Sequence, residues 1–406
     1  MKAAEDRRLK LYHALCLCLS DRLDQVAWDD FTPADWRLLA PMAKSEGVAP
    51  LLYWTFQRAN MPALRVPAKI LSFLASEYYR TAAQNMLLYQ ALDPILAALQ
   101  TAGVPVIVLK GAALANTLYP DPALRPMTDL DLLVRQVDFD HAEACLRDLG
   151  YRVGYPEMSP GFNQRVGFHI YLESTPDQAS AVELHWGLVA GQADVRTPDM
   201  GWFWGQAEEW VEAMEEGDKG RNPMTMVFNP TAQLLYMAAH LMLQHGEAQA
   251  RLLWYYDLHT LVSQCQAQVD WDELVQAAIS FGWGAALYRA LAGAQARFHT
   301  PFPGQLLQRL AEMVPEAARQ VAIGPISART TADNAWDAIL TAKSWRSRLR
   351  LAWRLLMPSS TYMRWRYCSK SKYLWVLFYP YRWWVIFTDG ISTYYRILIR
   401  TVYGNR

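Results

Sequence analysis

Cysteine is scarce in this chain of 406 residues, which holds five copies, odd in number and unevenly spaced. A disulfide framework needs an even set, so we expect reduced thiols and a cytoplasmic protein. Cys16 and Cys18 fall in an apolar helical pattern in which alternate residues face different ways, and they therefore make a poor metal site. The first residues, MKAAEDRRLKLYHALCLCLSDRLD, lack the long apolar stretch and the cleavage site of a secretion signal.

Several common catalytic motifs are also missing. The sequence contains neither a Walker turn nor a G-x-S-x-G motif, so it does not indicate a P-loop or a nucleophile elbow. The stretch GWGAALYRALAG follows no strand pattern, and it therefore indicates helix packing rather than a dinucleotide loop. Apolar residues make up 52% and charged residues 19%, which is typical of a globular protein. The length of 406 residues is enough for two or three domains.

The net charge of the whole chain is zero, but positive and negative residues are unevenly distributed along it. Residues 343–406 hold 13 Lys and Arg and one acid, a net charge of +12, so residues 1–342 carry −12. The same 64 residues contain 16 of the 51 aromatic residues. A basic, aromatic segment of this kind indicates contact with a charged partner surface.

The apolar pattern divides the rest of the chain. At Gly103 a helical period gives way to VPVIVLKG, TDLDLLV, VGFHIYLES and SAVELHWGL, which are typical of strands and alternate with two helical stretches. We expect an α+β fold with a small mixed sheet and helices on one of its faces. The predicted regions are a helical N-terminal region 1–100, the α/β core 101–192, a helical C-terminal region 193–342 and a basic aromatic tail 343–406.

Two aspartates interrupt an otherwise apolar strand pattern in LRPMTDLDLLV. Asp129 and Asp131 are two residues apart, so they share one face of a strand and repel each other. A divalent cation removes that repulsion, and Mg²⁺, or Mn²⁺ in its place, prefers such hard oxygen ligands. A pair of ions about 3.5–4 Å apart needs a third acid, for which Glu183 in AVELHW is the best candidate. The alternative is a solvated strand edge.

The turn VLKGAAL precedes the acids. Gly111 stands where a strand would end and a helix begin, so backbone N–H groups could approach a phosphate there, with Lys110 adding a positive charge. Gly111 could instead serve only close packing. Arg125 could reach the triphosphate or orient a carboxylate, or it could form an ion pair within its loop. Thr128 follows in the same loop, directly before the acids, and is a further candidate for nucleotide binding.

Histidines provide further candidates. His185 lies two residues after Glu183, so it could support the metal site or contact substrate, or it could be a core histidine. His169, on the preceding strand, has the same options, with the core role favoured. His240 and His245 are five residues apart, which is not the helical zinc spacing, and we expect them to pack between helices or line a cleft.

A second pair of residues, Arg251 and Asp257, falls in the helical pattern ARLLWYYD. We expect contacts between helices there, with substrate contact as the alternative.

The string LKGAALANTLYPDPALRPMTDLDLLV, with ELHW downstream, resembles bacterial nucleotidyltransferase-family proteins of the DNA polymerase β-like nucleotidyltransferase superfamily. The resemblance covers about residues 100–190, and HLMLQH and ARLLWYYDLHTL are similar to the helical half of that family. It implies that Asp129, Asp131 and Glu183 hold two Mg²⁺ ions. It also implies a phosphate-contacting turn at Lys110 and Gly111, in which Lys-Gly-Ala-Ala replaces the usual Gly-Gly or Gly-Ser.

The basic tail predicts a helix at a membrane surface. WRSRLRLAWRLLM places Trp345, Leu349, Trp353 and Leu356 on one stripe beside a stripe of Arg346, Arg350 and Arg354. The segment YLWVLFYPYRWWVIF adds interfacial aromatics, but its longest charge-free run is nine residues, too short to span a bilayer. The alternatives are packing onto the acidic body and nucleic-acid binding.

Together with the acidic pattern, the resemblance implies a Mg²⁺-dependent enzyme that moves a nucleoside monophosphate from a nucleoside triphosphate (NTP) to a hydroxyl acceptor and releases pyrophosphate. A different hypothesis is a weak or inactive nucleotide-binding scaffold docked at a membrane, and a third is an RNA-directed transferase. We expect a cytoplasmic protein, with peripheral attachment at the inner face of the membrane as an option. The acceptor, the preferred base and the oligomeric state stay open.

Overall fold

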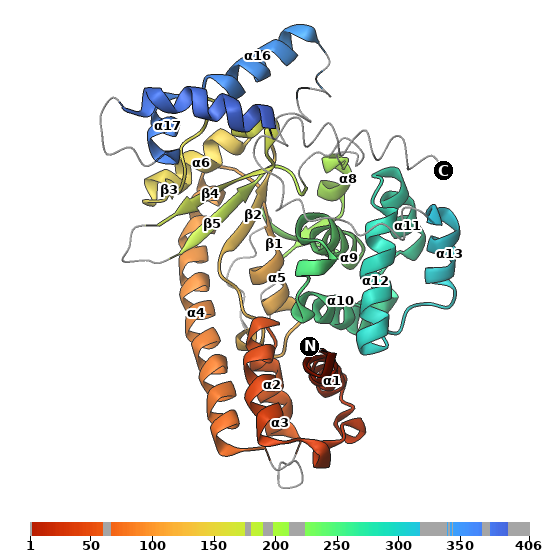
Figure 1. Cartoon of the computed structure of the whole chain (residues 1–406). Coiled ribbons are helices and arrows are strands. Elements are labelled where there is room, and N and C mark those ends of the chain that lie inside the picture. Colours follow the sequence, from red (N-terminus) through yellow and green to blue (C-terminus); the bar gives the residue numbers. More distant parts are fainter. Residues whose placement is uncertain are drawn as a thin grey trace.

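The computed structural model in Figure 1 shows a mixed sheet between two groups of helices, with a helical arm above. The structure describes residues 2–59, 66–174, 180–189, 198–210, 224–316, 344–367 and 374–388, together with Ile339 and Ala342. The helices before the sheet are α1 (Lys2–Leu19), α2 (Pro33–Ser45), α3 (Ala49–Arg58) and α4 (Ala68–Thr101). Short 3-10 turns lie at Leu23–Gln25, Trp28–Asp30, Pro122–Leu124, Glu247–Gln249, Gln266–Gln268 and Leu374–Leu377.

The long helix α4 connects the N-terminal helices to the sheet (Figure 1). Its buried residues Leu88, Leu92, Ile95 and Leu99 recur every three or four positions and form one apolar face. Nearer its start, Asn85 donates hydrogen bonds to the carbonyls of Pro122 and Arg125, at 2.7 and 2.9 Å. Helix α4 therefore supports both the sheet and the loop that leads into the predicted acidic strand.

The sheet has seven strands in the order β3-β4-β5-β2-β1-β7-β6. Neighbours β2 and β5 are parallel, as are β1 and β7, while the other four pairs are antiparallel. This mixed sheet flanked by helices confirms the predicted α+β fold class. The strands are β1 (Val106–Leu109), β2 (Leu130–Val134), β3 (Arg152–Val153), β4 (His169–Glu173), β5 (Ala181–His185), β6 (Ala207–Glu209) and β7 (Thr225–Phe228).

Both faces of the central strands are covered, so the expectation of helices on one face was too simple. Val106, Val108 and Leu132 belong to one apolar cluster with residues of α4 and of α6 (Phe139–Asp148). Ile107 and Leu133 belong to a larger cluster that includes α9 (Pro230–Ala239). Strands β1 and β2 are buried along their whole length, because both of their faces meet helices.

The sheet also extends into the region that was expected to be helical. Strands β6 and β7 come from that region and are only three and four residues long, too short for a period-2 pattern to stand out. The remaining helices are α5 (Lys110–Thr117), α7 (Asn163–Val166), α8 (Met200–Gly205), the π-helix His240–His245, α10 (Leu252–Cys265), α11 (Trp271–Ser280), α12 (Gly284–Phe298) and α13 (Leu306–Met313).

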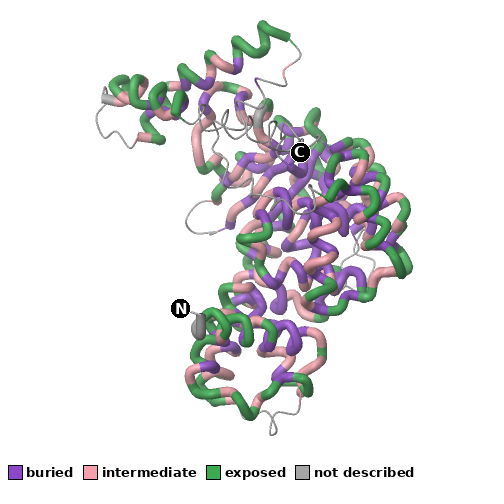
Figure 2. Tube along the Cα trace, turned by 45° about the vertical axis from the view of Figure 1, so that its right-hand side comes forward, coloured by how far each residue is buried: buried purple, intermediate pink, exposed green. Residues whose placement is uncertain are grey.

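The C-terminal unit, defined as residues 344–367 and 374–388, contains α16 (Trp345–Leu356), α17 (Ser360–Arg366) and a helical segment 378–388. It forms a third apolar cluster in which Leu351 and Leu355 join Met158 and Phe162 of the core. Figure 2 shows this arm beside the body with much of its length exposed. Within the described ranges, none of the helices has the length and apolar character needed to cross a bilayer.

Candidate functional site

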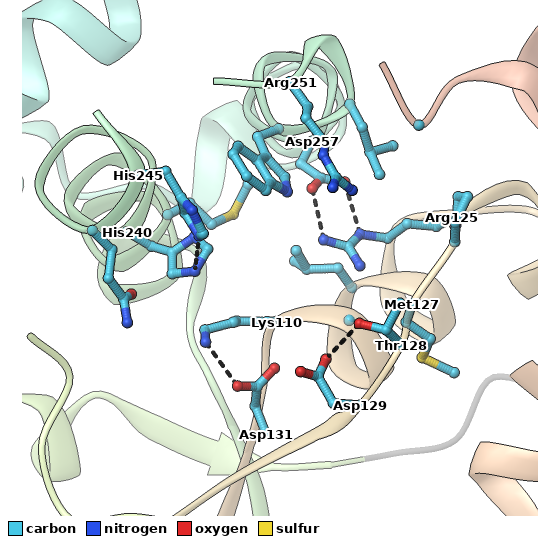
Figure 3. A pocket seen from close by; sticks show the side chains of 18 of the residues that line it. Lys110, Arg125, Met127, Thr128, Asp129, Asp131, His240, His245, Arg251 and Asp257 are labelled. Carbon is cyan, nitrogen blue, oxygen red and sulfur yellow. Dashed lines mark hydrogen bonds and ion pairs between the residues drawn. The ribbon is translucent and has the colours of Figure 1, made fainter. Parts of the chain in front are cut away.

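A pocket of about 500 Å³ lies between the acids of the inner strands β2 and β5 and the helices α9 and α10. Figure 3 shows Asp129 and Asp131 on one side, His240, His245 and Arg251 on the other, and Lys110 between them. Its two walls come from segments far apart in the sequence. We call them the carboxylate wall (β2, β5 and the loop before β2) and the helical wall (α9, the π-helix and α10).

The three predicted acids share the carboxylate wall. Strands β2 and β5 run side by side with Asp131 paired to Glu183 in register, so both side chains project from the same face. Asp129 stands just before β2 and lines the same pocket, where the Thr128 hydroxyl donates to its Oδ1 at 3.2 Å. Burial and the nearby charges of Asp131 and Glu183 raise the pKa of Asp129 to about 6.

Lys110 supplies a cation within this group of acids. Its Nζ lies 2.7 Å from Asp131 Oδ1 and 3.6 Å from Glu183 Oε2. Burial opposes the charged form, but the two carboxylates outweigh it and raise the pKa of Lys110 above its usual value. Its backbone φ of +43° lies in the left-handed region, which costs a non-glycine residue about 1–2 kcal/mol. The tight turn from β1 into α5 stores this strain and directs Lys110 at the acids.

His185 lies between two of the acids. Its Nε2 is 3.1 Å from Asp131 Oδ1 and 3.2 Å from Glu183 Oε2, and the side chain is fully buried. Burial opposes ionisation, but these hydrogen bonds outweigh it and raise the pKa of His185. The pKa of Glu183 shifts in the opposite direction. Burial raises it, but the hydrogen bond with His185 and the Lys110 charge lower it by more, so the net shift is downward. The network therefore favours the charged form of Glu183.

His169 is the second histidine on this face, opposite His185 in the β4–β5 pairing. Its Nε2 lies 3.8 Å from Glu183 Oε1, and burial together with the neighbouring His185 lowers the pKa of His169 to about 4. It therefore stays neutral near pH 7. One ligand atom each from His169, Glu183 and His185 lie within 4.8 Å of one another, so these residues could also hold a metal ion.

Gly111 is needed for close packing. A Cβ added there would lie 2.9 Å from Met127 Cβ and 3.3 Å from a guanidinium nitrogen of Arg125. The loop before β2 thus lies directly against the first turn of α5. Packing against Met127 is a sufficient reason for the glycine, whether or not a phosphate also approaches this turn.

Arg125 pairs with Asp257 of the helical wall. Its guanidinium donates from Nε and Nη2 to the two oxygens of Asp257, at 2.9 and 2.8 Å, in a buried bidentate pair (Figure 3). The Tyr119 hydroxyl donates to the same carboxylate at 2.5 Å. This contact joins the loop before β2 to α10 on the helical wall. Arg125 therefore forms an ion pair between two elements, rather than orienting one of the acids.

The π-helix His240–His245 explains a pairing that the sequence did not suggest. Residues five apart diverge on an α-helix, but a π-helix takes more residues per turn and brings them to one face. The Nε2 atoms of His240 and His245 lie 3.2 Å apart, and both side chains line the pocket. Burial and the nearby Lys110 charge lower the pKa of His245 to about 4 and that of His240 well below its usual value.

An aromatic and cationic surface continues this helical wall. The ring of His245 lies 4.3 Å from that of Trp254 with a tilt of 31°, and the Arg251 guanidinium is 5.6 Å from the Trp254 ring centre. Arg251 is exposed and lines the pocket, which makes it available to an anion. In the sequence, this surface is marked only by the motif HLMLQHG followed by ARLLWYYD. The motif does not reveal the placement of the histidines, because that placement depends on the π-helix.

The carboxylate wall fits divalent cations. Asp131 on β2, Asp129 just before it and Glu183 on the adjacent strand β5 supply hard oxygen donors. Burial and the charges of Asp131 and Glu183 together raise the pKa of Asp129, and a cation would relieve the repulsion among the three acids. Lys110 and His185 already neutralise part of that charge through Asp131 and Glu183. A metal ion would therefore share the acids with these two cationic side chains.

Comparison with known protein families gives a match over most of the chain. Residues 32–299, well over half of the chain, match the model of a family described as uncharacterised nucleotidyltransferases. No curated protein and no solved structure matches the chain. The matched range includes both pocket walls and ends before the C-terminal unit.

Proposed function

Because the chain belongs to this family of uncharacterised nucleotidyltransferases, we propose that its pocket moves a nucleoside monophosphate from an NTP to a hydroxyl acceptor. The observation that carries the proposal is the pairing of Asp131 with Glu183 on adjacent parallel strands, with Asp129 beside them in one pocket. Asp131 is buried and the other two acids are partly buried, so the group has a cost to stability that a ligand of opposite charge offsets. The order strand, turn, helix and acidic strand supports our assignment to the DNA polymerase β-like superfamily.

The proposed reaction is an in-line displacement at the α-phosphorus. The acceptor oxygen forms a bond to that phosphorus, and the bond from phosphorus to the oxygen bridging the α and β positions breaks. Pyrophosphate leaves with the electron pair, and the acceptor hydroxyl gives up its proton to a pocket carboxylate or to solvent water. The protein's contribution is to position the groups and to stabilise charge.

Asp129, Asp131 and Glu183 are the residues that would hold Mg²⁺. When bound, divalent cations supply charge neutralisation at the phosphates and acidify the acceptor hydroxyl. His185 fixes two of these carboxylates from its buried position between them. Lys110, 2.7 Å from Asp131, supplies a further positive charge where the phosphates would approach.

The helical wall is suited to the rest of the substrates. Trp254 and His245 present aromatic rings for stacking, and Arg251 presents an exposed guanidinium beside them. Aromatic rings and arginine together suit a nucleobase and its phosphates. We assign this surface to NTP binding, which leaves the acceptor to approach from the open side of the pocket.

The test is transfer of label from α-³²P-NTPs in the presence of Mg²⁺, with release of pyrophosphate measured in parallel. Asp131→Asn should lower kcat at least about 100-fold, because it removes a charge that acts mainly in the transition state. Asp148→Asn is a matched control, since Asp148 is an exposed carboxylate on α6. Trp254→Ala should raise KM more than it lowers kcat.

Three outcomes are informative. Transfer that depends on Asp131 but not on Asp148 supports the proposal. Equal activity in the Asp131→Asn variant and the wild type would contradict it. NTP binding without any turnover, for all four NTPs and a panel of hydroxyl acceptors, would indicate an inactive nucleotide-binding scaffold instead.

A further inference from the structure

The C-terminal unit holds most of the exposed large apolar side chains in the described part of the chain. Of the 19 large apolar side chains that are exposed, 12 fall between Trp345 and Phe387. Trp345, Leu349 and Trp353 are 66%, 60% and 65% exposed. Scattered single apolar residues on a surface are ordinary, but a concentration of tryptophans marks an interaction site.

Helix α16 has two apolar sides, one buried against the core and one exposed. Leu351 and Leu355 are buried against Met158 and Phe162, so one side of the helix is already used to attach it to the core. Trp345, Leu349, Trp353 and Leu356 fall within an arc of about 80° on a different side, counting 100° per residue. The predicted apolar stripe therefore exists, and it faces away from the body instead of packing onto it.

The segment 378–388 extends this stripe. The Trp383 indole N–H donates to the carbonyl of Leu356 at 2.9 Å, which places Trp383 beside the end of α16. Trp384 and Phe387, on the same segment, are 65% and 62% exposed. The two helices thus present one apolar surface, and Arg382 fixes their relation by donating from its buried guanidinium to the Leu355 carbonyl at 2.9 Å.

Charge on this unit has one sign. The described residues 344–367 and 374–388 contain seven arginines and no acid. On the helical wheel, Arg346 and Arg350 border the apolar stripe on one side and Arg348 borders it on the other. An apolar strip between two rows of cations matches a membrane interface, where acyl chains lie beneath anionic headgroups.

From this arrangement we propose that the C-terminal unit docks the protein on an anionic membrane surface, with the exposed side of α16 lying in the headgroup region. Tryptophan favours this zone because its ring is apolar and its N–H is polar. A single-stranded nucleic acid would use the arginines, but it leaves Leu349 and Leu356 without partners. The inference is independent of the chemistry in the pocket.

The test is co-sedimentation of the full chain with vesicles of phosphatidylcholine alone or mixed with 30% phosphatidylserine. We expect binding to the mixed vesicles at least about tenfold stronger, with a marked loss at high salt. A Trp345→Ser/Trp353→Ser variant should lose at least tenfold in vesicle affinity. Arg346→Glu/Arg350→Glu should lose a similar factor on anionic vesicles only.

Leu38→Ser is the matched control, since Leu38 on α2 is 48% exposed but lies outside the unit. It should bind vesicles as the wild type does. All variants are also assayed for nucleotidyl transfer and for thermal unfolding, so that loss of docking is distinguished from loss of folding or activity. The proposal is overturned by absence of binding to anionic vesicles, by wild-type binding of the tryptophan variant, or by tighter binding to an RNA oligonucleotide than to vesicles.

Discussion

The pocket and the C-terminal unit depart from the ordinary distribution of residues in opposite directions. The pocket buries charge: Asp131, Arg125 and His185 are each less than 7% exposed. The C-terminal unit exposes tryptophan, with Trp345 and Trp353 about two-thirds accessible. Each departure carries a cost in the isolated protein that a ligand of matching character would remove. The comparison thus points to a charged ligand for one region and an amphipathic surface for the other.

The two regions also differ in how much of that cost is already met within the chain. In the pocket, each buried charge has a partner within hydrogen-bond distance, such as Lys110 for Asp131 and Asp257 for Arg125. In the C-terminal unit, Trp345, Leu349 and Trp353 on the outward stripe of α16 are each at least 60% exposed. Truncating a buried charged side chain in the pocket should therefore destabilise the fold, whereas truncating an exposed side chain on the stripe should not.

The largest expected effect comes from the buried ion pair. Asp257→Ala leaves the Arg125 guanidinium buried without its carboxylate, and we expect a loss of about 3–5 kcal/mol in the free energy of unfolding. Trp353→Ala, which removes a larger but exposed side chain, should change it by less than about 0.5 kcal/mol. Urea unfolding followed by circular dichroism measures both. Equal effects of the two substitutions would remove the contrast between the regions.

A smaller effect should appear as a pH dependence in the metal-free protein. The raised pKa of Asp129, about 6 against an ordinary 3.8, means that the folded state holds this proton more tightly. Its contribution to stability is therefore full below pH 3.8 and is lost as pH rises to about 6, by about 3 kcal/mol at most. Asp129→Asn should remove this loss, so the variant gains stability relative to wild type between pH 4.5 and 7.5.

Urea unfolding in EDTA at the two pH values tests this prediction. Asp148→Asn is the control again, because Asp148 is exposed. A difference between variant and wild type that is the same at both pH values would show that burial does not perturb Asp129.

The smallest expected effect concerns the internal cation. Lys110→Met removes the ammonium that lies between Asp131 and Glu183, so Mg²⁺ should bind about tenfold more tightly. The increase in melting temperature on adding Mg²⁺ measures this affinity. Lys44→Met, which removes a 2.8 Å ion pair with Glu77 away from the pocket, should leave the Mg²⁺ response unchanged. Weaker Mg²⁺ binding in Lys110→Met would show that Lys110 supports the ion instead of competing with it.

Local patterns were enough to predict the α+β class and the side-by-side placement of acids. The alternation around Asp129 and Asp131 and the strand pattern around Glu183 each depend on a few neighbouring residues, and β2 and β5 formed where those patterns lie. Strands β6 and β7 were missed because they are short and lie where helical patterns dominate.

Contacts between distant segments could not be predicted in the same way. Arg125 and Asp257 are 132 positions apart, and no local pattern links a loop to a helix at that distance. The pairing of His240 with His245 depends on a π-helix, whereas the spacing was judged on α-helical geometry. The stripe on α16 was predictable as a pattern, but its outward direction depends on which side packs against Met158.

The parallel pairing of β2 and β5 has a consequence for how the protein can vary. Interstrand hydrogen bonds, and not the chain that runs between the strands, set the distance from Asp131 to Glu183. Insertions or deletions in the intervening turns should therefore be tolerated as long as the register holds. A slip of a single residue would have the opposite result, since it would turn Glu183 to the far side of the sheet while leaving every strand intact.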